Sequence, residues 1–282
     1  MNDAFVRPES PSAPPVALTI AGSDSGGGAG IQADLKTFAA LGVYGCSALT
    51  ALTAQNTRGV QSVHPVPPAF VSAQLRSVLA DFPVSAAKTG MLANADIIRA
   101  LLDTLGEFEP RALVVDPVML ATSGDRLLER EAEALLIREL LPRATLITPN
   151  LPEAAALLGE GIARTRDDRW RQAERLLALG PEAVLLKGGH GTGPDAEDLL
   201  LGAGFSETFS RPRLDTPNTH GSGCTLAAAI TAGLARGLSL PGAVGEAKGY
   251  LQGALAAGAR WQLGGGAGPL NHFHHQMSIN IN

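Results

Sequence analysis

The chain has 282 residues, of which 45% are apolar and 17% charged, so a sizeable core is possible and wholesale disorder is excluded. A net charge of −5 argues against a nucleic-acid-binding protein, and no apolar run is long enough to cross a bilayer. The two cysteines, Cys46 and Cys224, lie far apart, which favours reduced thiols. We therefore expect a cytoplasmic protein that acts on neither nucleic acid nor membrane.

The predicted elements begin after residues 1–15, whose four prolines and lack of an apolar stretch indicate a disordered tail rather than a signal peptide. A single domain is expected over residues 16–282. Short aliphatic runs predict strands at Val16–Ile20, Cys46–Thr53, Val84–Lys88, Ala112–Asp116, Thr145–Thr148 and Ala183–Lys187. Amphipathic segments predict helices at Ile31–Leu41, Ala69–Asp81, Asp96–Leu105, Glu129–Leu140 and Asp168–Leu179. Leu199–Leu201 and Glu207–Arg211 then form an expected hairpin, and two more helices start at Gly223 and near Pro241.

This alternation of strands and helices predicts a three-layer α/β/α fold with a mainly parallel sheet. Active sites in such sheets lie at the carboxyl ends of the strands. Ordinary turns explain the glycines found there, but not the two lysines, Lys88 and Lys187, that end apolar strands. The residues following the predicted strands are Gly22–Asp24, Gln55–Asn56, Lys88–Met91, Asp116–Val118, Pro149–Asn150 and Lys187–Gly189.

A glycine-rich segment, Gly22–Gly30, leads from the first strand into the first helix. It matches neither a dinucleotide-binding fingerprint nor a P-loop, so a ligand loop and a plain turn remain open. Asp34 falls within the apolar arc of the helix that follows, where a carboxylate is either paired at the core edge or faces a ligand. We prefer the ligand, because Asp34 lies one turn beyond the glycines.

Asn150 and Glu153 flank Leu151 and Pro152 at the start of another helix. The local pattern favours a helix cap, with Asn at the N-cap and Glu three residues later. The functional alternative places both residues near a Mg-triphosphate.

The segment Thr219–Thr225 precedes an apolar helix and contains Gly221, Ser222 and Gly223. These residues predict unpaired amides at a helix N-terminus, which suit an anion. Cys224 would lie in the first turn, where the dipole is expected to lower its pKa toward neutrality. The alternative, a small buried hydrophobe, is less favoured because of the adjacent glycines.

Three histidines near the chain end, His272, His274 and His275, have no carboxylate or thiol partner at ligand spacing. We expect them to dock the C-terminal segment and assign no metal to them.

Together these segments resemble the hydroxymethylpyrimidine/phosphomethylpyrimidine kinases of thiamine biosynthesis, which have a ribokinase-like fold. Each segment alone is weak evidence for this family, but the occurrence of all of them in this order is specific to it. The resemblance runs from about Ala17 to His275. It is carried by Ala17–Asp24, Gly30–Phe38, Thr50–Thr57, Lys88–Leu92, Val115–Met119, Thr148–Ala154, Leu186–His190 and Asn218–Thr225.

The resemblance implies a kinase that uses ATP and Mg²⁺ to phosphorylate the hydroxymethylpyrimidine and then its monophosphate, and we expect a homodimer. Asp34 and Gln55 would read the amino group and ring nitrogens. Cys224 would be the base that replaces an aspartate of other ribokinase relatives. The pyrimidine pocket would comprise Gly22, Asp34, Gln55, Met91 and Val118, with Asp116 and Glu153 at the metal and Asn150, Lys187, Thr219, Gly221, Ser222 and Gly223 at the phosphates.

The sequence departs from the family pattern at Ser25–Gly28, where a Pro-Ser or Ser-Ser usually precedes two glycines, and between His190 and Asp198, which is short. Three alternatives remain open. A pyridoxine or pyridoxal kinase would use the same fold, although Gln55 and Asp34 favour the aminopyrimidine. An NAD-dependent oxidoreductase is disfavoured because the chain lacks the glycine fingerprint of that class. A non-catalytic sensor would be expected to have lost Lys187 or the anion hole, and both are present in the sequence.

Overall fold

The computed structural model describes residues 13–119, 129–189, 191 and 193–275. The expected tail over residues 1–15 therefore falls mostly outside the described residues, as does His190. Nine strands form one sheet in the order β3-β2-β1-β4-β5-β6-β7-β8-β9. They are β1 (Val16–Asp24), β2 (Tyr44–Asn56), β3 (Gly59–Pro65), β4 (Val84–Thr89), β5 (Leu113–Val115), β6 (Leu146–Ile147), β7 (Ala183–Leu186), β8 (Asp195–Gly202) and β9 (Phe205–Pro212).

The six central strands run parallel, whereas β3 at one edge and β8 and β9 at the other pair antiparallel. This confirms the predicted mainly parallel sheet and the terminal hairpin. The sequence did not predict β3. Its residues are largely exposed, and its two valines belong to no buried apolar face that would mark it as a strand.

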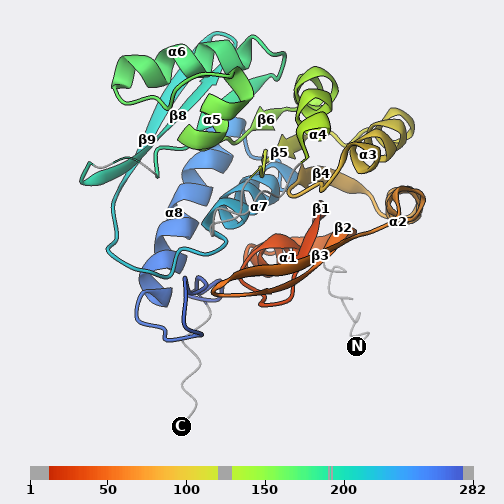
Figure 1. Ribbon diagram of the computed structural model, residues 1–282, viewed down its shortest axis with the longest axis horizontal. Coiled ribbons are helices and arrows are strands. Elements are labelled where there is room, and N and C mark those ends of the chain that lie inside the picture. Colours follow the sequence, from red (N-terminus) through yellow and green to blue (C-terminus); the bar gives the residue numbers. More distant parts are fainter. Residues whose placement is uncertain (1–12, 120–128, 190, 192, 276–282) are drawn as a thin grey trace, which may run out of the picture.

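Helices cover both faces of the sheet, which confirms the three-layer α/β/α class (Figure 1). One face carries α1 (Gly30–Ala40), α7 (Ser222–Ala235) and α8 (Leu240–Gly258). The other carries α2 (Pro68–Leu79), α3 (Ala95–Glu107), α4 (Arg130–Leu135), α5 (Leu151–Leu158) and α6 (Arg166–Leu177). A π-helical turn, Leu136–Leu140, and a 3₁₀ turn, Leu141–Arg143, continue α4 toward β6. None of the helices in the described ranges is both long and apolar enough to span a membrane.

The strand order creates a switch point at β1, because the chain moves from β1 to β2 on one side and returns to β4 on the other. Loops leaving β1 and β4 therefore diverge and open a crevice beyond their carboxyl ends. The C-terminal segment packs against α7 and α8. His272 docks as expected: its Nε2 lies 3.0 Å from Thr225 Oγ1, and its carbonyl accepts a hydrogen bond from the Tyr250 hydroxyl.

Candidate active site

A cavity of about 580 Å³ opens at the carboxyl ends of the parallel strands. This volume suits a small molecule with an extended partner such as a nucleotide. Thirteen of the fourteen candidate residues line it, and seven of these thirteen follow the ends of predicted strands. Those lining it are Gly22, Gln55, Met91, Val118, Asp116, Asn150, Glu153, Lys187, Thr219, Gly221, Ser222, Gly223 and Cys224.

One end of this cavity is built on β1, β2 and β4. Gly22 lies at the end of β1, and a Cβ there would come within 2.8 Å of Met91 Cε, so the glycine allows the methionine to lie against the β1 backbone. The Gln55 side chain comes from β2, and its Oε1 accepts a hydrogen bond from Thr53 Oγ1 at 3.1 Å. Val118 follows β5. The result is a mainly apolar slot with one amide at its edge.

Asp34 does not reach this slot, which corrects the expectation that it reads a ligand. Its side chain is fully buried, and its carboxylate lies 2.9 and 3.0 Å from Lys88 Nζ and accepts a hydrogen bond from Thr19 Oγ1 at 2.6 Å. Lys88 is fully buried as well. The paired alternative is therefore the one found, and the partner is the lysine that ends β4.

For each residue of this pair, burial and ion pairing shift the pKa in opposite directions. Burial raises the pKa of Asp34, against the influence of Lys88 and Thr19. Burial alone would lower the pKa of Lys88, but the Asp34 carboxylate outweighs it and raises that pKa. The Lys88 ammonium thus stays protonated inside the core because Asp34 is its counter-charge.

The other end of the cavity contains the second strand-end lysine. Lys187 Nζ lies 3.0 Å from Asp116 Oδ1 and 4.0 Å from Glu153 Oε2. Burial alone would lower the pKa of Lys187, but these two carboxylates raise it. A Cβ at Gly223 would lie 3.4 Å from Lys187 Nζ, so the start of α7 adjoins this ion cluster.

The carboxylates of the cluster are held by different partners. Asp116 Oδ1 also accepts a hydrogen bond from Thr148 Oγ1 at 2.9 Å. Glu153 Oε2 accepts one from the Asn150 N–H at 2.8 Å, and the Asn150 side chain accepts one from the Glu153 N–H. The expected helix cap of α5 is therefore present, and the same two residues also line the cavity. Burial, helped by the neighbouring Asp116 charge, raises the pKa of Glu153 to about 7.

The N-terminus of α7 forms a hole at the cavity, where Gly221 and Gly223 present main-chain N–H groups, whereas the Ser222 N–H donates to the Thr219 carbonyl at 3.1 Å. The N-cap residue is Gly221, with φ of +84°, and no side chain caps the helix, as is also true of α1, α2 and α4. Side chains of Asn94, Asn150, Thr165 and Ser239 cap α3, α5, α6 and α8. An uncapped helix N-terminus that lines a cavity can receive an anion.

Cys224 lies in the first turn of α7, as expected, but its predicted acidity is wrong. Burial raises the pKa of the thiol to about 11, and the charges of Asp34 and Asp116 add to this effect. Lys88 and the Gly30 backbone N–H act in the opposite direction without overcoming burial. The thiol is consequently protonated at neutral pH in the absence of ligands.

No metal-binding cluster is complete on its own. Within the described parts of the chain, no group of three or more His, Cys, Asp or Glu side chains could hold a metal ion. Asp116 and Glu153 instead offer two hard oxygen donors beside the α7 hole. This donor set fits a Mg²⁺ ion that takes most of its remaining ligands from phosphate oxygens and water.

Sequence reasoning assigned no role to several residues at the site. Lys248 of α8 lies at the cavity and pairs with Asp198 of β8, whose Oδ1 accepts a hydrogen bond from the Gly188 N–H at 2.8 Å. Lys248 follows Ala247 on the buried face of a helix rich in alanine and glycine, which was a detectable signal. Asp24 and His220 also line the cavity and contact each other.

Known proteins resemble this chain over most of its length. A family model described as phosphomethylpyrimidine kinase matches residues 24–271. The hydroxymethylpyrimidine/phosphomethylpyrimidine kinase of Rhizobium meliloti is 54% identical over 92% of this chain and 97% of its own length.

Two solved structures extend the comparison to bound ligands. Bacillus subtilis pyridoxal kinase in an ADP complex matches with a TM-score of 0.87 and 39% identity, covering 94% of this chain and 100% of that chain. Staphylococcus aureus pyridoxal kinase with AMP-PCP and pyridoxal matches with a TM-score of 0.85 and 34% identity, covering 94% and 96%.

The buried pair generates a stability prediction. Asp34→Ala leaves the Lys88 ammonium unpaired in the core, and we expect a loss of about 3–5 kcal/mol in the free energy of unfolding, measured by urea denaturation. Glu107→Ala is the matched control, because it removes an ion pair with Arg76 that is exposed to solvent and should change the free energy of unfolding far less. A variant at Asp34 as stable as the control would show that the pair does not hold this part of the core.

Proposed function

Because this chain belongs to the phosphomethylpyrimidine kinase family, we propose that it transfers the γ-phosphoryl group of ATP to 4-amino-5-hydroxymethyl-2-methylpyrimidine. It then phosphorylates the monophosphate to the diphosphate that serves thiamine diphosphate biosynthesis. The observation that carries the proposal is the continuity of one cavity. An apolar slot with a single amide opens directly onto a helix N-terminus and a lysine–carboxylate cluster.

The slot suits an aminopyrimidine. Gln55 offers both an amide donor and an amide acceptor, which complement a ring nitrogen and the neighbouring amino group. Gly22 and Met91 provide a flat apolar surface, and the Met91 thioether favours contact with an aromatic ring. Val118 lines the same end of the cavity.

The phosphate end suits the charge of a nucleotide triphosphate. Lys187 and the N–H groups of Gly221 and Gly223 would neutralise and orient the transferred group, and the side chains of Ser222, Asn150 and Thr219 add polar donors at the rim. Asp116 and Glu153 would hold Mg²⁺, which supplies further charge neutralisation. Positioning and electrostatics provide most of the rate in phosphoryl transfer, so this arrangement is chemically sufficient.

Cys224 remains the proposed base for the acceptor hydroxyl. Its high pKa means that the thiolate is scarce before reaction, so the proton must move as charge leaves the γ-phosphate. The Lys88 ammonium beneath it, which lowers the pKa of Cys224, would stabilise the thiolate as it forms.

Pyridoxal is the second candidate acceptor, because both matching structures with ligands are pyridoxal kinases. The relative with higher identity carries the pyrimidine kinase name, and Gln55 complements the aminopyrimidine. We therefore propose the aminopyrimidine, rather than pyridoxal, as the preferred acceptor.

We also propose a cytoplasmic homodimer. Leu52 of β2 and Val63 of β3 are more than two-fifths exposed, and their pairing with His64 and Thr53 places them on opposite faces of this edge hairpin, where a second copy could cover either residue. Sedimentation velocity would distinguish this dimer from a monomer.

A coupled assay for ADP release tests the function. With Mg-ATP, we expect turnover on the hydroxymethylpyrimidine and on its monophosphate, and a kcat/KM at least tenfold lower on pyridoxal. Gln55→Leu removes the amide that distinguishes these acceptors, and we expect it to raise the KM of the pyrimidine about 5–100-fold. Equal use of pyridoxal, or an unchanged KM in Gln55→Leu, would contradict the assignment.

The role of Cys224 predicts a pH dependence. If the thiolate takes the proton, its fraction rises tenfold per pH unit below the pKa of about 11. We therefore expect kcat of the wild type to rise between pH 6.5 and 9, and Cys224→Ala to lose about 10²–10⁴-fold in kcat together with this pH slope. An alanine variant with near-normal kcat at pH 7.5 would leave positioning as the whole mechanism.

A further inference from the structure

The Asp24 carboxylate at the end of β1 is a junction of hydrogen bonds. It accepts from the N–H groups of Gly26, Gly28 and Ala29 at 2.8, 3.0 and 2.9 Å. Asp24 is 3% exposed. Burial alone would raise the pKa of Asp24. Hydrogen bonds from His220 and from this loop nevertheless hold that pKa below its usual value. The carboxylate is therefore ionised and acts only as an acceptor.

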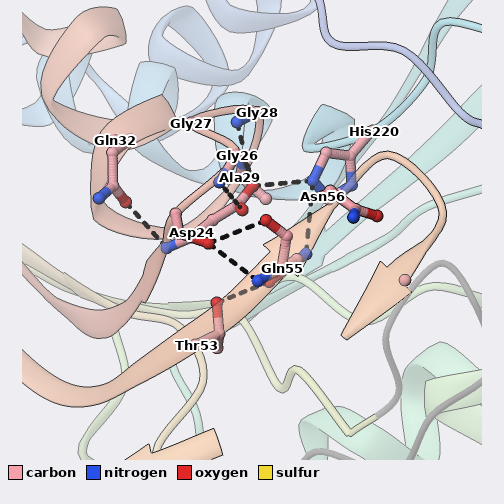
Figure 2. Close-up of polar contacts among 12 residues, drawn as sticks. Asp24, Gly26, Gly27, Gly28, Ala29, Gln32, Thr53, Gln55, Asn56 and His220 are labelled. Atoms are coloured by element: carbon pink, nitrogen blue, oxygen red, sulfur yellow. Dashed lines mark hydrogen bonds and ion pairs between the residues drawn. The ribbon is translucent and has the colours of Figure 1, made fainter. Parts of the chain in front are cut away.

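His220 supplies the fourth contact and comes from a distant part of the chain. Its Nε2 lies 2.9 Å from Asp24 Oδ2, and Figure 2 shows the ring directed toward that carboxylate. Because the carboxylate can only accept, Nε2 must carry the proton and donate it. This single bond joins the glycine loop that precedes α1 to the loop that precedes α7.

The two loops also meet through their backbones. A Cβ on Gly221 would lie 1.9 Å from the Gly28 carbonyl oxygen, and a Cβ on Gly28 would lie 2.4 Å from His220 Cδ2. The contact thus requires glycine at both positions. The backbone N–H of His220 donates to the Gly268 carbonyl at 3.1 Å, which fixes the other side of the same loop.

Gln55 stands beside this junction (Figure 2). Its Nε2 lies 3.5 Å from His220 Nε2. Both nitrogens are donors in this arrangement, so no hydrogen bond joins them, and the Gln55 amide remains available to a ligand. Ser25 also ties the glycine loop to β2, since its hydroxyl donates to the Gln55 carbonyl and accepts from the Gln55 N–H, both at 2.8 Å. The acceptor-reading residue and the phosphate hole therefore adjoin one junction.

We propose that His220, held by Asp24, is a positioning residue that fixes the α7 anion hole relative to the pyrimidine slot. It contacts neither reacting group in this role. Its hydrogen bond keeps the Gly221–Gly223 amides at the correct distance and angle from the acceptor hydroxyl. The proposal rests on the proposed function, because it takes the slot and the hole to be the acceptor and γ-phosphate sites.

The test compares steady-state kinetics of His220→Leu and His220→Gln with wild type. Leucine removes the donor, whereas the glutamine amide nitrogen can reach the place of Nε2. Misplacement of reacting groups by about 1 Å can cost 10²-fold, so we expect His220→Leu to lose about 10–100-fold in kcat with an acceptor KM within threefold of wild type. His220→Gln should recover most of the loss. The exposed His64 on β3 provides the control, and His64→Leu should leave both constants unchanged.

Three results would overturn the proposal: a normal kcat in His220→Leu, a raised KM with normal kcat, or a glutamine variant as slow as the leucine variant. If His220→Leu does not fold, His220→Asn replaces it, because its amide is too short to reach Asp24. The proposal then requires a low kcat in His220→Asn and a nearly normal kcat in His220→Gln. Equal kcat values in the two variants would refute it.

A second measurement needs no acceptor and so separates this proposal from the proposed function. Nitrogen-15 NMR of the ligand-free protein should show a protonated Nε2 for His220, assigned by its absence in His220→Gln, and Asp24→Asn should shift that signal. An unprotonated Nε2 would disprove the Asp24 tie, whereas a wild type inactive on every pyrimidine would disprove the proposed function alone.

Discussion

An ammonium group inside an apolar core needs a carboxylate beside it, and this requirement shapes the site at two strand ends. Lys88 on β4 and Lys187 after β7 both follow buried aliphatic residues. Lys88 has no exposed surface, and Asp34 is its counter-charge. Lys187 instead borders the cavity and shares two carboxylates, Asp116 and Glu153. One lysine is thus satisfied within the protein, and the other remains able to meet a phosphate.

The Lys88–Asp34 pair also determines where the neighbouring elements lie. Asp34 projects from α1 across β1 to β4, so α1 must pack over the switch point of the sheet. The glycine loop that leads into α1 is thereby held at the carboxyl end of β1. Asp24 then gathers the N–H groups of that loop and reaches His220, which brings the start of α7 to the same place. The cavity is therefore a consequence of a few buried charges and the loops they hold.

Much of this could be predicted from the sequence. The aliphatic strands and amphipathic helices indicated a parallel α/β sheet. The strand-end rule collected half of the candidate residues, and the glycine pattern before α7 supplied five more, from Thr219 to Cys224. The exposed edge strand β3 gave no apolar signal and was not predicted. The prediction that Asp34 faces a ligand was wrong because a helical projection identifies the buried face of a helix but not the residues that pack against it. Its partner Lys88 is 54 residues away in the chain.

The error for Cys224 has a different cause. Its place in the first turn of a helix was predicted correctly, and a helix dipole does lower a thiol pKa. The sequence could not show that protein would enclose the thiol, and this burial raises its pKa, with a further contribution from the charges of Asp34 and Asp116. The contact between Asp24 and His220 joins residues 196 positions apart, and such long-range pairs carry no local pattern.

The central claim is that Lys187 is kept charged for a phosphate rather than for the fold. Thermal unfolding of Lys187→Met with and without Mg-ATP tests it most directly, with Lys36→Met, a lysine of α1 outside the cavity, as control. We predict that Lys187→Met melts within a few degrees of wild type without ligand but loses most of the rise in Tm that Mg-ATP produces, whereas Lys36→Met keeps that rise. A Lys187→Met protein that fails to fold, or one that retains the full rise, would contradict the claim.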